Sequence, residues 1–375
     1  MWKPDPDIWN RKTILTVTVL LIIALNIDIY GSAYTLWMSL HKMSSLIIGM
    51  AMITTFVEVN GWTISGVLID RYGTKKVQFF SLLILLISGA TGAMLDGLAV
   101  LCCLLVRFMV CQIALTANTI QIRDLLPEEK QGRGFGQLFM VGFFGGVVGA
   151  AIGSWLASDY QAVWKWVGPI LTIFGIVVLM YTQQSNRVPE KASIRPHPEV
   201  IRLSVPLIGI MAIQSVFITF VVIDLGVENG TFVRVGSYAG SGLAGLIVPF
   251  LLKHIKENEK AFIRYGVIVT SASLLFLYWP NVVGLIVASF VIGIIFNGIQ
   301  TQILGTKVYL LTDQKGRAAS TSRLVQGAGR IIGIYGLGMI RDHIGKSMWL
   351  VLPIILLASL PVFEWTFRHC PAWKK

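Results

Sequence analysis

Three charged side chains lie inside stretches of the sequence that are otherwise apolar. Asp28 lies in the stretch 13–36, Glu58 in 45–68 and Arg107 in 97–121. A carboxyl group in such surroundings either stays ionised beside a basic partner or takes up a proton, because desolvation disfavours its charge. We expect Glu58 to pair with Arg107 and Asp28 to titrate, so that the three residues form a proton-coupling site. The alternative is a static ion pair that only orders the helices.

The apolar stretches belong to a chain suited to a lipid environment. Its 375 residues are 55% hydrophobic and 13% charged, whereas a soluble domain carries roughly 25% charged residues. Twelve stretches approach the ~20 residues that cross a ~30 Å hydrocarbon core: 13–36, 45–68, 77–95, 97–121, 134–157, 162–181, 204–224, 232–252, 262–279, 281–304, 318–340 and 347–366. A charge at the centre of such a span costs about 2.5–3.5 kcal/mol and marks a candidate functional residue.

The net charge of +12 indicates orientation in the membrane. With twelve crossings both termini lie on one side, and most Lys and Arg residues lie there too. Those on the opposite side are Lys42, Lys165, Arg234, Arg341 and Lys346. Because basic loops stay inside, we expect a multi-pass protein of the cell membrane with cytoplasmic termini. The positive charge needs no nucleic-acid partner to explain it.

Nothing in the sequence indicates an enzyme. The four cysteines, Cys102, Cys103, Cys111 and Cys370, show no metal-ligand spacing. No paired Ser and Lys, and no Cys and His pair within a span, is apparent. We therefore expect no catalytic residues, no metal and no cofactor.

The chain divides into two similar halves. A polar, proline-containing segment, 183–202, separates residues 1–182 from residues 203–375. Leu125, Gly132-Arg133 and Asp159 recur at a nearly constant offset as Leu310, Gly316-Arg317 and Asp342. The sequence predicts an all-α fold of twelve transmembrane helices in two pseudo-symmetric six-helix bundles, with a substrate site between them.

One loop carries a recognisable motif. Between the second and third spans the sequence reads Gly66-Val-Leu68-Ile-Asp70-Arg71-Tyr-Gly73-Thr74-Lys75-Lys76. This resembles the major facilitator superfamily signature G-x-L-x-D-R-x-G-R-K and departs from it at Thr74. The resemblance implies a major facilitator fold and a gating motif of Gly66, Asp70, Arg71, Gly73 and Lys75, which joins the cytoplasmic ends of the two halves. Arg123 and Asp124 are placed to join that cluster.

Two further elements resemble the same family less closely. Arg107 corresponds to the arginine of an R-x-x-x-G motif in which Cys111 replaces the glycine. Gly145, Gly146 and Gly149 resemble part of the G-P-x-x-G-G motif of antiporters, which implies export. The same glycines could simply pack one helix against another, as small residues do in membranes.

Polar side chains at depth form a candidate substrate cavity. They are Asn26, Tyr30, Asn60 and Trp62 in the first half and Gln214, Asn297, Gln300 and Arg330 in the second. Such residues also join helices by hydrogen bonds. We expect Arg330 to lack a compensating charge, which suits an anionic or zwitterionic substrate. We expect Arg323 to extend to the membrane interface.

Three functions are compatible with these features. The leading hypothesis is a proton-coupled antiporter, monomeric in the lipid bilayer, that exports a small amphipathic drug or metabolite. The second is a proton symporter that takes up a small organic anion or a sugar-like nutrient. The third is a membrane sensor or scaffold without transport activity, which would be expected to carry a large cytoplasmic loop or tail.

Overall fold

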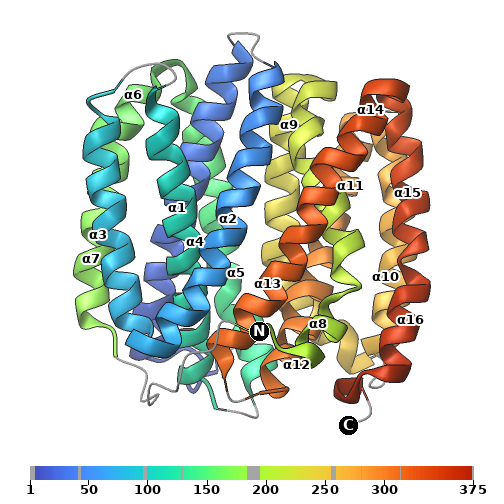
Figure 1. Cartoon of the computed structure of the whole chain (residues 1–375). Coiled ribbons are helices and arrows are strands. Elements are labelled where there is room, and N and C mark those ends of the chain that lie inside the picture. Colours follow the sequence, from blue (N-terminus) through green and yellow to red (C-terminus); the bar gives the residue numbers. More distant parts are fainter. Residues whose placement is uncertain are drawn as a thin grey trace.

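The computed structural model describes residues 5–40, 44–95, 99–127, 130–183, 195–254, 259–279, 281–312 and 314–373. These residues form helices and short connections, and no strand occurs among them. The helices run along a common direction and form a bundle, with both marked chain ends in its lower part (Figure 1). The predicted all-α, polytopic membrane fold is confirmed.

The helices fall into two groups along the chain. The N-terminal half contains α1 (Arg11–Leu40), α2 (Ser44–Tyr72), α3 (Thr74–Gly92), α4 (Val100–Leu125), α5 (Gln131–Trp155), α6 (Tyr160–Ala162), the π-helical turn η4 (Val163–Val167) and α7 (Gly168–Tyr181). The C-terminal half contains α8 (Pro198–Ser204), α9 (Leu207–His254), α10 (Glu259–Leu274), α11 (Val282–Asn297), the π-helical turn η6 (Gly298–Leu304), α12 (Gly305–Leu310), α13 (Lys315–Ile332), the π-helical turn η7 (Gly333–Leu337), α14 (Gly338–Ile344), α15 (Met348–Ala358) and α16 (Leu360–His369). Of the predicted linker 183–202, residues 184–194 lie outside the described residues and Pro198–Ser204 is helical.

The predicted spans overlap these helices. Among the described residues, eight helical stretches are long and apolar enough to cross a membrane, and the pair α8 with Leu207–Val221, bent by 55°, makes up to nine. The stretch Lys315–His369 holds two predicted spans. The chain turns between them at Gly345, whose φ of 57° favours glycine. Helices α2 and α3 coincide with the predicted spans 45–68 and 77–95.

Helix α9 differs from the prediction of two spans with a loop between them. It is continuous over 48 residues, which at 1.5 Å per residue gives about 72 Å, more than twice the hydrocarbon thickness. Its beginning packs on the C-terminal group of helices, where Gly329 of α13 meets Ile208 and Gly338 of α14 meets Phe220. Its later part packs on α5 and α11. The helix therefore supplies both predicted crossings, 204–224 and 232–252. Its backbone stays helical through residues 225–231, where a loop was predicted.

The two halves meet along α5 with α9 and along α2 with α13. A Cβ at Gly245 of α9 would collide with the carbonyl oxygen of Gly136 in α5, and one at Gly327 of α13 would collide with Val59 of α2. Only glycine permits these backbones to approach so closely. The large apolar core of the C-terminal half includes Phe217, Phe296 and Trp349.

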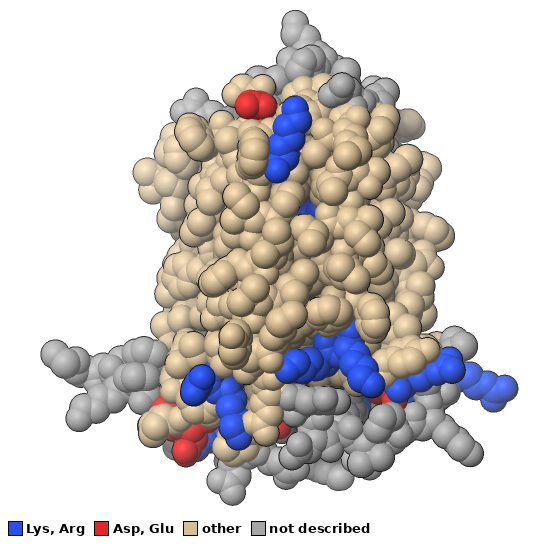
Figure 2. Space-filling view, turned by 90° about the vertical axis from the view of Figure 1, so that its left-hand side faces the viewer, with Lys and Arg blue, Asp and Glu red and all other residues tan. Residues whose placement is uncertain are grey.

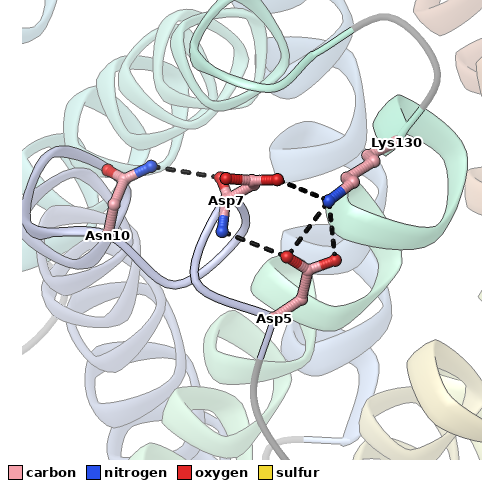
Figure 3. Close-up of polar contacts among 4 residues, drawn as sticks. All are labelled: Asp5, Asp7, Asn10 and Lys130. Carbon is pink, nitrogen blue, oxygen red and sulfur yellow. Dashed lines mark hydrogen bonds and ion pairs between the residues drawn. The ribbon is translucent and has the colours of Figure 1, made fainter.

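The end of the bundle where α1 begins and α16 ends is the more basic one, and we call it the terminal end. Figure 2 shows Lys and Arg side chains gathered there on one face, below a broad band of other residues. The segment before α1 is bound to this end. Lys130 Nζ, at the start of α5, lies 3.0 Å from Asp5 Oδ2 and 2.6 Å from Asp7 Oδ2 (Figure 3). Hydrogen bonds to Asp7 and then Asp5 raise the pKa of Lys130.

Candidate functional site

A cavity of about 200 Å³ lies between the two halves. Its wall is formed by α1, α2, α4 and α5 from the N-terminal half and by α9, α11, η6 and α13 from the C-terminal half. The lining residues are Leu20, Ala24, Ile27, Asp28, Trp62, Gln112, Leu115, Phe139, Gly142, Phe143, Gly146, Gln214, Tyr238, Ser241, Asn297, Gln300, Arg323 and Arg330. The wall is therefore partly apolar and partly charged.

Glu58 forms an ion pair that joins the two halves. Its Oε2 lies 2.8 Å from Nη1 of Arg330 on α13, and both side chains are largely buried. The Arg330 guanidinium also lies 5.1 Å from the centre of the Trp62 ring. The expectation of an uncompensated Arg330 is therefore wrong, because Glu58 supplies its counter-charge.

Asp28 makes a second connection between the halves. Its Oδ1 accepts a hydrogen bond of 2.7 Å from the hydroxyl group of Tyr238 in the later part of α9. Gly146 of α5 leaves room for this contact, since a Cβ there would lie 3.1 Å from Asp28 Oδ2 and from the Tyr238 ring. Both predicted proton-binding acids thus contact the opposite half across the interface.

Arg107 is placed differently from the prediction. Its guanidinium donates to the carbonyl oxygen of Leu85 at 2.6 Å and to Oδ1 of Asn26 at 2.7 Å. It lies 3.8 Å from the centre of the Tyr30 ring. Arg107 contacts no carboxylate among the described residues, so the predicted Glu58–Arg107 pair is wrong. The residue orders α1, α3 and α4 inside the N-terminal half.

Five of the predicted cavity residues line the cavity, and three do not. The five are Trp62, Gln214, Asn297, Gln300 and Arg330. Asn26 and Tyr30 are buried against Arg107, and Asn60 is exposed and bonds to the carbonyl oxygen of Phe56. Each of the three lies two residues from Asp28, Glu58 or Trp62 on the same helix. Two residues on a helix correspond to about 200°, which places these side chains on the opposite face.

Several lining residues were not predicted as such from the sequence, among them the polar residues Arg323 and Gln112. Arg323 does not extend to the membrane interface as expected. It lines the cavity, and its guanidinium lies 5.5 Å from the centre of the Trp62 ring. The spacing contained the signal, because Arg323 and Arg330 are seven residues apart and so share one helix face. Gln112 accepts a 2.8 Å hydrogen bond from the indole of Trp62.

The terminal ends of the halves are joined by the gating motif. A Cβ at Gly316, in the first turn of α13, would collide with the Asp70 carboxylate. That carboxylate therefore lies at the helix N-terminus, where the helix dipole favours a negative charge. Gly66 lies against Gly316 and Ser320 in the same way. Asp124 of α4 forms a 2.8 Å ion pair with Lys315.

Of the remaining residues of the cluster, Gly73, Lys75 and Arg71 act within the N-terminal half, and Arg123 contacts both halves. Gly73 has a φ of 83°, which allows the sharp turn from α2 into α3. Lys75 Nζ donates to the carbonyl oxygens of Met180 and Thr182 at the end of α7. Arg71 lies over the Tyr72 ring. Arg123 is buried between the rings of Phe135 and Tyr309, the second of which belongs to the C-terminal half.

Comparison with known sequences decides the family. The sequence pattern of the Major Facilitator Superfamily matches residues 16–334. The chain belongs to the Major Facilitator Superfamily. A comparison with curated proteins finds no significant sequence match.

Solved structures of other major facilitator transporters share the fold. The human organic anion transporter MFSD10 (TETRAN) has a TM-score of 0.73 at 12% identity, covering 96% of this chain and 100% of its own. A variant of the E. coli fucose:proton symporter FucP has a TM-score of 0.68 at 11% identity, covering 95% and 99%. FucP in its outward conformation has a TM-score of 0.70 at 11% identity, covering 94% and 98%.

The glycines that resembled the antiporter motif of this superfamily lie between α5 and α1. A Cβ at Gly145 would lie 3.0 Å from the carbonyl oxygen of Leu21, and one at Gly149 would lie 3.0 Å from Cβ of Asp28. Gly146 faces Asp28 and Tyr238, as described above. Close helix packing and the room beside Asp28 account for these positions, as the packing alternative predicted.

Proposed function

We propose that this major facilitator protein is a proton-coupled secondary active transporter that moves a small amphipathic solute through the cavity between its halves by alternating access. The carrying observation is that both acids of the N-terminal half contact groups of the C-terminal half, Glu58 with Arg330 and Asp28 with Tyr238. Protonation of either acid removes a charge from a contact between the halves. Proton binding is thereby linked to their relative movement.

The ion pairs that join the halves are buried to a similar extent at both levels. Glu58 and Arg330 are largely buried. Asp124 and Lys315 at the terminal end are as little exposed, and Asp70 is buried as well. Removal of one partner from a buried ion pair costs about 3–5 kcal/mol, because the other charge stays buried. Protonation of Glu58 removes the charge from its own pair, so it lowers the cost of separating the halves at that point.

Two of the structurally similar proteins are an organic anion transporter and a proton symporter. Both uses are consistent with this cavity. With the glycine stripe explained by packing, export of a drug or metabolite and uptake of a nutrient have equal support, and the direction of proton movement must separate them.

The test is substrate-dependent proton flux. The purified protein is reconstituted in liposomes with an imposed pH gradient and an internal pH-sensitive dye, and solutes are added singly from a library of amphipathic compounds. We expect at least one solute to start proton movement, inward with the solute for symport or against it for antiport. Solute transport without proton movement would rule out proton coupling. The absence of both solute transport and proton movement would contradict the proposed function.

A further inference from the structure

The polar groups of the cavity differ in whether they already have a charged or hydrogen-bonded partner. Asp28 is bonded to Tyr238, and Glu58 is paired with Arg330. Arg323 donates a 3.0 Å hydrogen bond from Nη1 to Oε1 of Gln326 and forms no ion pair among the described residues. A guanidinium carries five N–H donors. Arg323 is therefore a cation of the cavity with spare bonding capacity, alongside Gln214 Oε1, a neutral acceptor that has no hydrogen-bond partner among the described residues.

We propose that the transported solute is an amphipathic organic anion whose carboxylate binds Arg323, and that it travels together with a proton held by Glu58. This inference rests on the proposed function and names the substrate class and the sense of coupling. Protonated Glu58 releases Arg330, which then joins Arg323 in binding the anion.

The two guanidinium groups line the same cavity next to Trp62. Arg323 lies 5.5 Å and Arg330 5.1 Å from the centre of the Trp62 ring. Trp62 is in turn held by Gln112. Arginine binds carboxylates through two parallel hydrogen bonds, and two such groups in one cavity suit a single carboxylate between them.

The rest of the wall suits the apolar part of such a solute. Leu20, Ala24 and Ile27 of α1 line the cavity together with Phe139 and Phe143 of α5. Burial of apolar surface contributes about 25 cal/mol per Å². A solute with one carboxylate on an aryl or alkyl body would fit both the charged and the apolar parts of the cavity wall.

Charge balance links the anion to a proton. The charged residues that line the cavity or pair with its lining are Asp28, Glu58, Arg323 and Arg330, two of each sign. An added anion alone would leave one uncompensated negative charge in a region of low dielectric constant, which is costly. One proton taken from the bulk by the Glu58 carboxylate restores the balance. The solute carboxylate then replaces that of Glu58 beside Arg330.

The charged and titratable groups around Glu58 are consistent with this exchange. Arg330 and Arg323 face it from α13, and Cys111 faces it from α4. Asp28, on α1, lines the same cavity and is the acid whose titration could mimic that of Glu58. Because binding linkage is reciprocal, anion binding must tighten as the pH falls if Glu58 takes up the proton. A cationic solute would instead bind an acid in place of a proton, and its binding would tighten as the pH rises.

The test measures binding without a gradient. Tryptophan fluorescence of the purified protein in nanodiscs is titrated with a series of aryl and alkyl monocarboxylates, each with its neutral amide and its matched primary amine. The measurements are made at two pH values one unit apart, both above the pKa of a free carboxylic acid, ~4. We expect a carboxylate to bind more tightly than its amide, and more tightly at the lower pH, by up to about tenfold for one linked proton.

Variants show which residues cause the preference for a carboxylate and its pH dependence. Arg323→Gln should weaken carboxylate binding at least about tenfold, the loss expected for a charged hydrogen-bonding partner, and leave the amide unchanged. Glu58→Gln should retain carboxylate binding and lose its pH dependence, while Asp159→Asn, at an exposed acid outside the cavity wall, keeps both. If no carboxylate exceeds its amide, or Asp28→Asn alone abolishes the pH dependence, the inference is overturned. A neutral or cationic solute that drives proton flux overturns it too, while the transporter assignment stands.

Discussion

A buried charge in this protein is stabilised in one of two ways, and the difference separates Arg107 from Arg330. Arg330 has a carboxylate partner in the opposite half. Arg107 is bound by neutral acceptors and aromatic rings within one half. A charge held by neutral groups has no partner that titrates, so we assign Arg107 to the stability of the N-terminal half and Arg330 to the coupling of the two halves.

Substitution of Asn26 tests this assignment. Asn26→Leu removes the acceptor of Arg107 Nη2 and leaves a buried donor unsatisfied, which should destabilise the protein by about 1–3 kcal/mol. Asn60→Leu is the matched control, because Asn60 is exposed and bonds only locally, and its effect should stay within about 0.5 kcal/mol. Thermal unfolding in detergent compares the two. Equal stability of both variants would show that Asn26 does not hold Arg107.

Among the elements, the first turn of α13 is the point where the halves join at the terminal end. Gly316→Ala introduces a methyl group where the Asp70 carboxylate lies, so it should displace that carboxylate and loosen the contact. Gly336→Ala is the control, since a Cβ there meets nothing within 4 Å. A single cysteine at Ser320, which lies against Gly66, should react faster with a membrane-impermeant thiol reagent in Gly316→Ala than in Gly336→Ala. Identical rates would mean that the Asp70 contact does not close this end.

The segment before α1 is a second such element. Its carboxylates raise the pKa of Lys130, so the contact is complete below the ordinary lysine pKa and is lost only as the pH rises through the raised value. At neutral pH, Lys130→Met should therefore speed hydrogen exchange at Ile8 and Trp9, whose amides bond to Asp5. Exchange in α3 is the internal reference. Unchanged exchange at Ile8 would show that burial of the Ile8 side chain, and not the Lys130 contact, holds the segment in place.

Across the whole molecule, the sequence predicted the positions of the helices better than it predicted the contact partners of their side chains. Span positions follow from hydrophobic length, and Asp28, Glu58 and Trp62 lie within helices whose packing brings them to the interface between the halves. Contact partners depend on helix rotation, and an error of two residues turned Asn26 and Asn60 to the wrong face. The Glu58–Arg330 pair joins residues 272 apart in the chain, a distance at which only the packing of the halves decides. Packing also decides that α9 stays helical between its two predicted crossings, which the sequence alone did not indicate.

The orientation predicted from the basic loops is a property of the whole chain. In a background without native cysteines, Lys12→Cys at the terminal end should react only with reagents on the cytoplasmic side. Asp159→Cys, exposed at the other end, should react only from outside. Labelling of intact cells and of inverted vesicles distinguishes the two sides, and the reverse pattern would contradict the predicted cytoplasmic termini.

Glu58 connects all three scales, because its single charge links the halves and faces the cavity arginines. It is also the acid that we propose to carry the proton, in place of Asp28, which the sequence favoured. The most direct test compares wild-type and Glu58→Gln protein in liposomes, with proton flux and exchange of labelled solute measured in parallel. We predict that wild-type protein moves protons only when its solute is present. Glu58→Gln should still exchange solute across the membrane but move no protons with it. Full solute-dependent proton flux in Glu58→Gln would contradict the proposed coupling.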